Sequence, residues 1–112
     1  MKKVLYTEQA INLLEEDVRR LVEGGYFSEE DYAVEYIRNI LQFFALNFNH
    51  LTPTIAPEFF KQFSMSESPL QYVKYCKSRQ ITWYAFFEEL AEIYSVVYVA
   101  NNRLIGHHLD AK

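Results

Sequence analysis

The spacing of apolar residues changes once along this chain, close to Leu70. Before Leu70, apolar side chains recur every three or four residues, the spacing that places them on one side of a helix. After Leu70, the chain contains three runs rich in Tyr, Val, Phe and Ile, residue types that are common in β-strands. This change predicts a helical first part joined near Leu70 to a C-terminal sheet.

The first part predicts two helices that form a hairpin. Thr7 can cap a helix beginning at Glu8, because its side-chain oxygen accepts a backbone N–H bond, and the pair Gly24-Gly25 ends that helix. Ser28 is a candidate cap for a second helix, and the short connection favours antiparallel neighbours. The apolar positions are Ile11, Leu14, Val18, Leu21 and Val22 in the first helix, and Tyr32, Ala33, Tyr36, Ile37, Ile40, Leu41, Phe44 and Phe48 in the second.

Strands are predicted at both ends of the sequence. Residues 3–6 form a β-prone run before the first helix. Residues 70–77, 81–87 and 93–99 form three more runs, and their short links are typical of an antiparallel meander. The first strand also needs a partner, because an isolated strand is unstable.

Two connections complete the expected fold. Pro57 suits the start of a short helix, since its fixed φ matches a first helical position. Asn101 and Asn102 suit a turn, with residues 103–108 following as a short tail along the sheet. We therefore expect an α+β fold of order β-α-α-(short α)-β-β-β, in which an N-terminal strand and helical hairpin pack on a C-terminal antiparallel sheet. The 112 residues suit a single domain, residues 1–112.

Charge is unevenly distributed, although the net charge is only −4. Residues 1–60 and 81–112 are acidic overall, whereas residues 61–80 contain four basic residues and one acidic residue. Nucleic-acid affinity rests on neutralising phosphates, so direct binding of free nucleic acid is not expected of this chain. No apolar run approaches the roughly 18 residues that cross a membrane, and we expect a cytoplasmic protein without membrane contact.

Two later segments carry a resemblance to a known family. Residues 79–87 read Arg-Gln-Ile-Thr-Trp-Tyr-Ala-Phe-Phe, and residues 94–102 read Tyr-Ser-Val-Val-Tyr-Val-Ala-Asn-Asn. These segments resemble the central and last strands of ParE-like members of the RelE/ParE toxin superfamily, including the paired Asn, and the expected element order is similar over nearly the whole chain. The resemblance implies a small toxin of a type II toxin–antitoxin module, silenced by a tightly bound cognate antitoxin.

The superfamily implies two different mechanisms. RelE-like members cut mRNA on the ribosome, whereas ParE-like members inhibit DNA gyrase and cleave nothing. For RNA cleavage, the resemblance makes Arg79 the nearest match to a phosphate-holding residue, with Lys77 on the same side. His107 and His108 lie where a C-terminal acid would come from, and Tyr84 could stack on a base. Lys74, Tyr84 and Arg103 are the candidate residues for binding a partner.

The residues favour the non-catalytic, ParE-like hypothesis. Metal-independent RNA cleavage needs a base, cations around the phosphate and an acid, but no carboxylate stands at a matching position for the base. Trp83 and Tyr84 occupy the central strand where more positive charge would be expected. An mRNA endonuclease and a non-toxic binding module with the same fold remain the alternatives. The simplest interpretation of Lys74, Lys77 and Arg79 is solvated surface.

Other chemistry gains little support from the sequence. Cys76 is the only cysteine, so it has no internal disulfide partner and no set of metal ligands around it. His107 and His108 lack a third ligand at a sensible spacing, and are most simply an exposed tail. We expect no cofactor and no metal. The many aromatic side chains are compatible with self-association or with burial by a partner.

Overall fold

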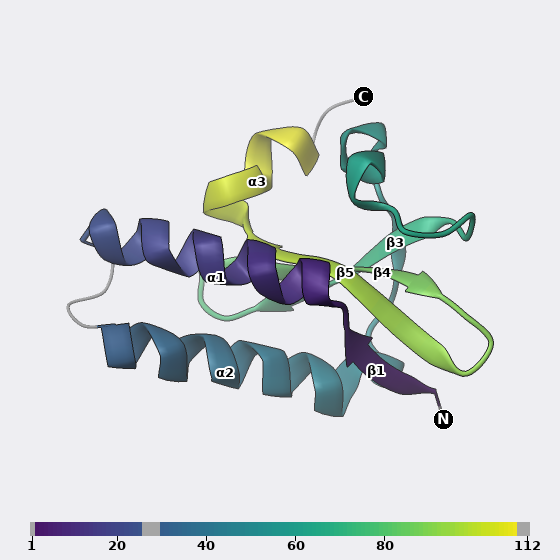
Figure 1. Ribbon diagram of the computed structural model, residues 1–112, viewed down its shortest axis with the longest axis horizontal. Helices are drawn as coiled ribbons and strands as arrows, with labels where there is room; N and C mark the ends of the chain where they lie inside the picture. Colours follow the sequence, from purple (N-terminus) through teal and green to yellow (C-terminus); the bar gives the residue numbers. More distant parts are fainter. Residues whose placement is uncertain (1, 26–29, 110–112) are drawn as a thin grey trace.

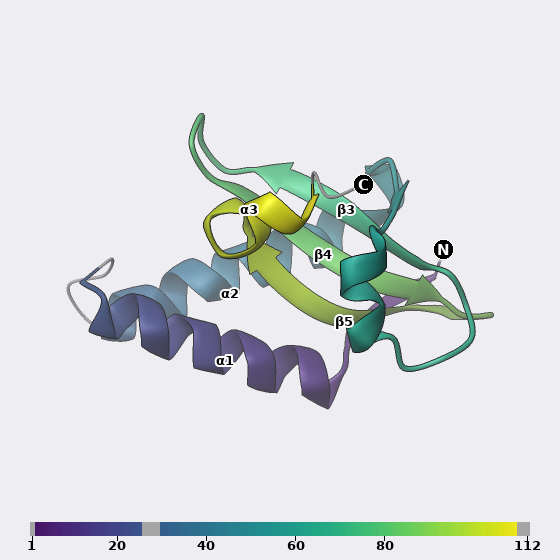
Figure 2. The same cartoon turned by 90° about the horizontal axis from the view of Figure 1, so that it is seen from above.

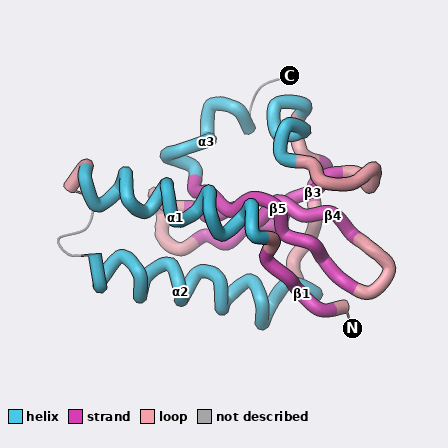
Figure 3. Tube along the Cα trace, in the orientation of Figure 1, coloured by secondary structure: helices cyan, strands magenta, loops and turns pink. Residues whose placement is uncertain are grey.

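The computed structural model describes residues 2–25 and 30–109, and their arrangement is shown in Figure 1 and, by secondary structure, in Figure 3. The elements in chain order are β1 (Lys3–Tyr6), α1 (Glu8–Glu23), α2 (Glu30–Asn47), the 3-10 helix η1 (Phe48–His50), β2 (Thr54–Ile55), the 3-10 helix η2 (Glu58–Phe63), β3 (Leu70–Cys76), β4 (Thr82–Glu89), β5 (Ile93–Asn101) and α3 (Asn102–Leu109). The fold is α+β, as predicted, and the change of period at Leu70 marks the start of β3.

Within the described residues, five strands form one sheet in the order β1-β5-β4-β3-β2. β3, β4 and β5 pair antiparallel, which confirms the predicted meander. β1 pairs in parallel with β5, with Leu5 opposite Ser95. Parallel neighbours cannot be joined by a tight turn, and here everything from α1 to β4 lies between them. The sheet is therefore mixed: its C-terminal strands are antiparallel, as predicted, and the N-terminal strand, whose partner the sequence left open, joins them in parallel.

The ends of α1 follow from its local sequence. The Thr7 hydroxyl oxygen accepts a hydrogen bond from the Ala10 backbone N–H at 3.0 Å, which confirms Thr7 as the cap. At the other end, the Gly24 N–H donates to the Arg20 carbonyl, and Gly25 has a φ of 80°. That left-handed conformation costs glycine little and stops the helix. The predicted cap of the second helix, Ser28, lies outside the described residues.

One face of the sheet is covered by α2 (Figure 1). Ile40 and Phe44 of α2 are fully buried and belong to the same core cluster as Trp83 of β4. At the edge of this cluster, the Phe43 ring stacks on Tyr75 of β3 with 3.6 Å between ring centroids. Burial of several large apolar side chains, each contributing about 1.5–3 kcal/mol, is what holds the hairpin against the sheet.

The opposite face is covered by η2 and α3, which lie over the strands in Figure 2. Phe60 of η2 is fully buried and stacks on Phe86 of β4, with 4.3 Å between ring centroids. Ile105 of α3 is buried in the same cluster. Covering both faces in this way gives the sheet two apolar cores, so both sides of β4 and β5 are buried.

The C-terminal segment differs from its prediction. Residues 101 and 102 do not form a turn, and residues 103–108 are not a tail along the sheet. β5 continues to Asn101, whose side-chain Oδ1 accepts hydrogen bonds from the backbone N–H groups of Arg103 and Leu104. This is the bonding of a helix cap, and α3 follows because its apolar side, including Ile105, packs onto the sheet.

The edge strand β2 was not predicted either. The sequence Thr-Pro-Thr at residues 52–54 indicates a break in structure, yet Thr54 and Ile55 pair with Tyr72 and Gln71 of β3. Proline has no N–H to donate, so it is tolerated next to a short edge strand. Long-range pairing therefore creates a strand that the local sequence does not specify.

A β-bulge lies in the middle of β5. Phe87 is opposite Val96 and Phe86 is opposite Tyr98, so Val97 is the extra residue. Val97 and Tyr98 consequently belong to the same core cluster, under η2 and α3. The bulge thus places Tyr98 on the same face as Val97 and close enough to Asp17 of α1 for the two side chains to interact electrostatically.

Candidate protein-binding site

The predicted basic residues of the β3–β4 hairpin do not share one surface. The Lys77 Nζ lies 5.6 Å from the ring centroid of Tyr36, a residue of α2, so Lys77 is on the hairpin face of the sheet. Arg79 is exposed in the turn, within the predicted connection between the two strands and three residues before β4 begins at Thr82. The turn bonds of Ser78 with Gln80 and Ile81 delay the strand.

Lys74 and Tyr84 are on the other face. They are cross-strand partners in the β3–β4 ladder, and the neighbouring Val73 and Tyr75 point into the α2 core. Tyr84 also contacts Tyr72, with ring centroids 5.5 Å apart. The structure therefore brings together two of the predicted binding residues, Lys74 and Tyr84, and separates them from Lys77.

The remaining candidates belong to α3. Arg103 is exposed in its first turn. The His108 ring stacks on Phe59 of η2, with 3.5 Å between ring centroids and 5° between planes. The side chain of His107 lies outside the described residues. His108 is thus partly buried and fastens α3 to η2, which corrects the expectation of an exposed tail.

Asn102 has a structural role that the sequence did not reveal. Its Oδ1 accepts the backbone N–H of Thr82 at 2.9 Å, and its Nδ2 donates to the Gln80 carbonyl at 3.0 Å. The first turn of α3 is thereby tied to the start of β4. Together with the cap formed by Asn101, these bonds give both asparagines a structural role.

A groove with a largely apolar lining lies between α1 and α2, which run side by side in Figure 1. We call it the hairpin groove. Its cavity volume is about 750 Å³. Leu14 and Ile37 are buried in its floor, whereas Val34 on its wall is 45% exposed. Its lining residues are Ile11, Leu14, Glu15, Val18, Arg19, Val22, Glu23, Val34, Ile37, Arg38 and Leu41.

The charged residues of the hairpin groove are only partly paired. Arg38 forms an ion pair with Glu35 at 3.4 Å. Glu15, Arg19 and Glu23 have no ion pair with any residue in 2–25 or 30–109. The sequence predicts one apolar stripe that includes Ile11, Val18 and Val22, but it does not reveal that these three side chains line a groove. These side chains are partly exposed, which distinguishes them from the buried core residues of the same stripe, and the apolar periodicity alone does not reveal that difference.

The other side of α1 carries a buried carboxylate. Asp17 is 8% exposed, its Oδ2 has no hydrogen-bond partner among the described residues, and its Oδ1 is 3.9 Å from an Arg20 nitrogen. Burial raises the pKa of Asp17 to about 6, although Arg20 opposes the shift. Burial also raises the pKa of Tyr98 to about 12, with a further contribution from Asp17.

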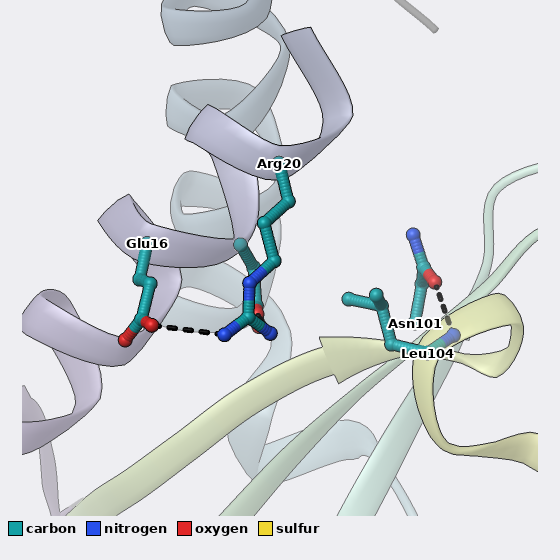
Figure 4. A network of polar contacts seen from close by, with 5 residues as sticks. Glu16, Arg20, Asn101 and Leu104 are labelled. Carbon is teal, nitrogen blue, oxygen red and sulfur yellow. Dashed lines mark hydrogen bonds and ion pairs between the residues drawn. The ribbon is translucent and has the colours of Figure 1, made fainter. Parts of the chain in front are cut away.

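Figure 4 shows the surroundings of this carboxylate. Arg20 extends from α1 and bonds Glu16 at 2.9 Å, while the side chain of Asn101 reaches Leu104 at the start of α3. Arg20 is exposed and its pairs lie within one helix, so they contribute little to stability. Asp17 is therefore a desolvated acid that its one cation only partly compensates.

Three further findings bear on function. In residues 2–25 and 30–109, no three His, Cys, Asp or Glu side chains gather as metal ligands. Of the helices in the same ranges, none combines the length and apolar character needed to cross a bilayer. No protein-family model, curated protein or solved structure matches the chain.

Proposed function

We propose that this protein acts by binding other proteins, as a ParE-like toxin of a type II toxin–antitoxin module that a cognate antitoxin neutralises. The toxin assignment is supported by the resemblance of residues 79–87 and 94–102 to strands of ParE-like proteins. DNA gyrase is the target that this resemblance implies.

The observation that carries the binding mode is the hairpin groove. Val34 on its wall is 45% exposed, and its volume of about 750 Å³ is within the range of clefts that bind ligands. The separation of Lys77 from Lys74 weighs against catalysis, because RNA cleavage requires cations that converge on one phosphate. Binding is the activity that such a surface supports best.

Controlled expression in a bacterium tests this proposal. We expect growth to stop, gyrase supercoiling of plasmid DNA to fall, and cellular mRNA to stay intact. Coexpression of the small adjacent reading frame, if it encodes the antitoxin, should restore growth. Normal growth at high expression would leave a non-toxic binding module, and normal supercoiling at growth-arresting levels would exclude gyrase as the target.

A second candidate function, ribosome-dependent mRNA cleavage, is favoured by one local observation. Lys74 lies opposite Tyr84, which contacts Tyr72, so a cation stands beside two rings that could stack on RNA bases. In this case wild-type protein should cut mRNA in a ribosome assay, and Lys74→Ala and Tyr84→Ala should each reduce cutting. Absence of cutting by the wild type would end this alternative.

A further inference from the structure

The hairpin groove has the dimensions of a helix-binding site. Its α1 wall extends from Ile11 to Val22, about 16 Å at 1.5 Å per residue, or three helical turns. The floor, at Leu14 and Ile37, is buried, and the walls are mostly aliphatic. Two helices packed side by side leave a furrow that a third helix can fill, and apolar grooves of this kind bind amphipathic helices.

The walls also indicate that the occupant is a helix and not a strand. Both walls are α-helices, whose backbone N–H and C=O groups already bond within the helix. An extended segment in the groove would find no backbone partner and would lose its own hydrogen bonds to water. A helical occupant satisfies its backbone internally, so it can bury an apolar side in the groove at lower cost.

The charge of the hairpin indicates which residues should flank the apolar side of the bound helix. α1 contains five acidic and two basic residues, and α2 contains three acidic and one basic residue, which gives the hairpin a net charge of −5. Among the charged residues that line the groove, Arg38 is paired with Glu35, whereas Glu15, Glu23 and Arg19 have no ion pair with any other described residue, so the unpaired carboxylates outnumber the unpaired guanidinium two to one. A helix with Lys or Arg beside its apolar seam would meet these carboxylates, whereas an acidic one would be repelled.

The same charge argues against other occupants. A second copy would bring another hairpin of net charge −5 against the first, and like charges across an interface oppose association. An anionic membrane surface would be repelled for the same reason. We propose that the hairpin groove binds a basic amphipathic helix of another protein. This rests on the proposed function only in that the chain works by binding protein.

Synthetic helical peptides binding to the purified full chain provide the test. One peptide of about 18 residues carries Leu at helical spacing with Lys on the flanks. A second has the same Leu seam with Glu flanks, and a third has the first composition with its seam scrambled. By fluorescence anisotropy, we expect the Lys-flanked peptide to bind about tenfold or more tightly than the Glu-flanked one, and the scrambled peptide not to bind. Equal binding of the Lys- and Glu-flanked peptides would overturn the proposal.

Two pairs of variants locate the site. Val34→Glu should weaken binding of the Lys-flanked peptide about tenfold or more, whereas Leu46→Glu should leave it unchanged. Leu46 is 72% exposed on the same helix and does not line the groove, so it is a matched control. If Val34→Glu binds like the wild type, the peptide lies elsewhere and the proposal fails.

The second pair of variants reverses charges inside and outside the groove. The double variant Glu15→Lys, Glu23→Lys should lose affinity for the Lys-flanked peptide and gain it for the Glu-flanked one. Glu67→Lys, Glu92→Lys changes the net charge equally at exposed positions outside the groove and should alter neither affinity by more than about twofold. The same change in both double variants would mean a general charge effect and would contradict a specific site.

Analytical ultracentrifugation of the chain alone tests whether the groove binds a second copy of the chain instead. We expect a monomer at all concentrations, and a dimer abolished by Val34→Glu would overturn the proposal in favour of self-association. These measurements need neither toxicity nor gyrase. Peptide binding without growth arrest would therefore contradict only the toxin function, and growth arrest without peptide binding would contradict only the groove.

Discussion

The two sides of α1 make different kinds of contact. Toward η2 and β5, the Gln9 side chain donates to the carbonyls of Phe63 and Val97, and Asp17 is buried beside Tyr98. Toward α2, α1 presents aliphatic walls and no hydrogen bond or ion pair to α2 within the described residues. One side fixes the position of the helix, and the other leaves surface for a partner. This difference predicts where substitutions destabilise the chain and where they do not.

The largest loss of stability is expected when a buried side chain of α1, Leu14, is shortened. Leu14→Ala removes a side chain that is 3% exposed and should lower the free energy of unfolding by about 2–5 kcal/mol. Val22→Ala, on the groove wall, should cost about 1 kcal/mol or less, because this side chain is only partly buried. Urea denaturation measures both, and equal costs would show that the groove wall is as closely packed as the core.

Asp17→Asn should stabilise the protein at neutral pH. The folded-state pKa of about 6 is above the ordinary value of 3.8, so the folded state holds the proton more tightly. Stability from the protonated carboxyl is complete below about pH 4 and is lost as the pH rises through 6. We expect the variant to gain about 1–2 kcal/mol over the wild type at about pH 7.5 and almost nothing near pH 4. A gain independent of pH would mean that Asp17 is not the titrating group.

Gln9→Ala should be the next largest effect. It removes the bonds to the Phe63 and Val97 carbonyls, at 2.9 and 3.1 Å, and should cost about 1–2 kcal/mol. Asn12→Ala is the control, since Asn12 is exposed on the same helix and should change stability by less than about 0.5 kcal/mol. If both variants unfold at the same urea concentration, the two Gln9 bonds do not fix α1.

The smallest effect is expected on the groove side. Val34→Ser should change the unfolding free energy by no more than about 0.5 kcal/mol, because the side chain is 45% exposed. A thermal melt checks this. A clear drop in melting temperature would mean that Val34 supports the hairpin itself, and the contrast between the two sides of α1 would be weaker than described.

The local features of this fold were predictable from sequence, and the long-range ones were not. Thr7 and the glycines at 24 and 25 specify the ends of α1 by backbone chemistry alone, and the new period specifies β3. The parallel pairing of β1 with β5 and the pairing of β2 with β3 depend on residues far apart in sequence. α3 was missed although Asn101 followed by Leu104 and Ile105 is a recognisable cap and apolar pattern.

The candidate site shows the same division. Lys74, Tyr84 and Arg103 were predicted as binding residues, and the register of the short β3–β4 hairpin places two of them, Lys74 and Tyr84, opposite each other. The positions of Lys77 and His108 depend on Tyr36 and Phe59, partners in other elements. The hairpin groove depends on how far α1 and α2 separate, which a hydrophobic stripe in either helix does not encode.

The parallel pairing of β1 with β5 also sets an order of events during synthesis on the ribosome. Lys3 stands opposite Ile93, so β1 has no strand partner until β5, about 90 residues later, has been translated. Until then, the apolar sides of Val4 and Tyr6 stay uncovered, while the β3–β4 hairpin can already close. Docking of β1 is a late, high-contact-order step that should limit the folding rate. A chaperone that shields β1 would act before β5 is made.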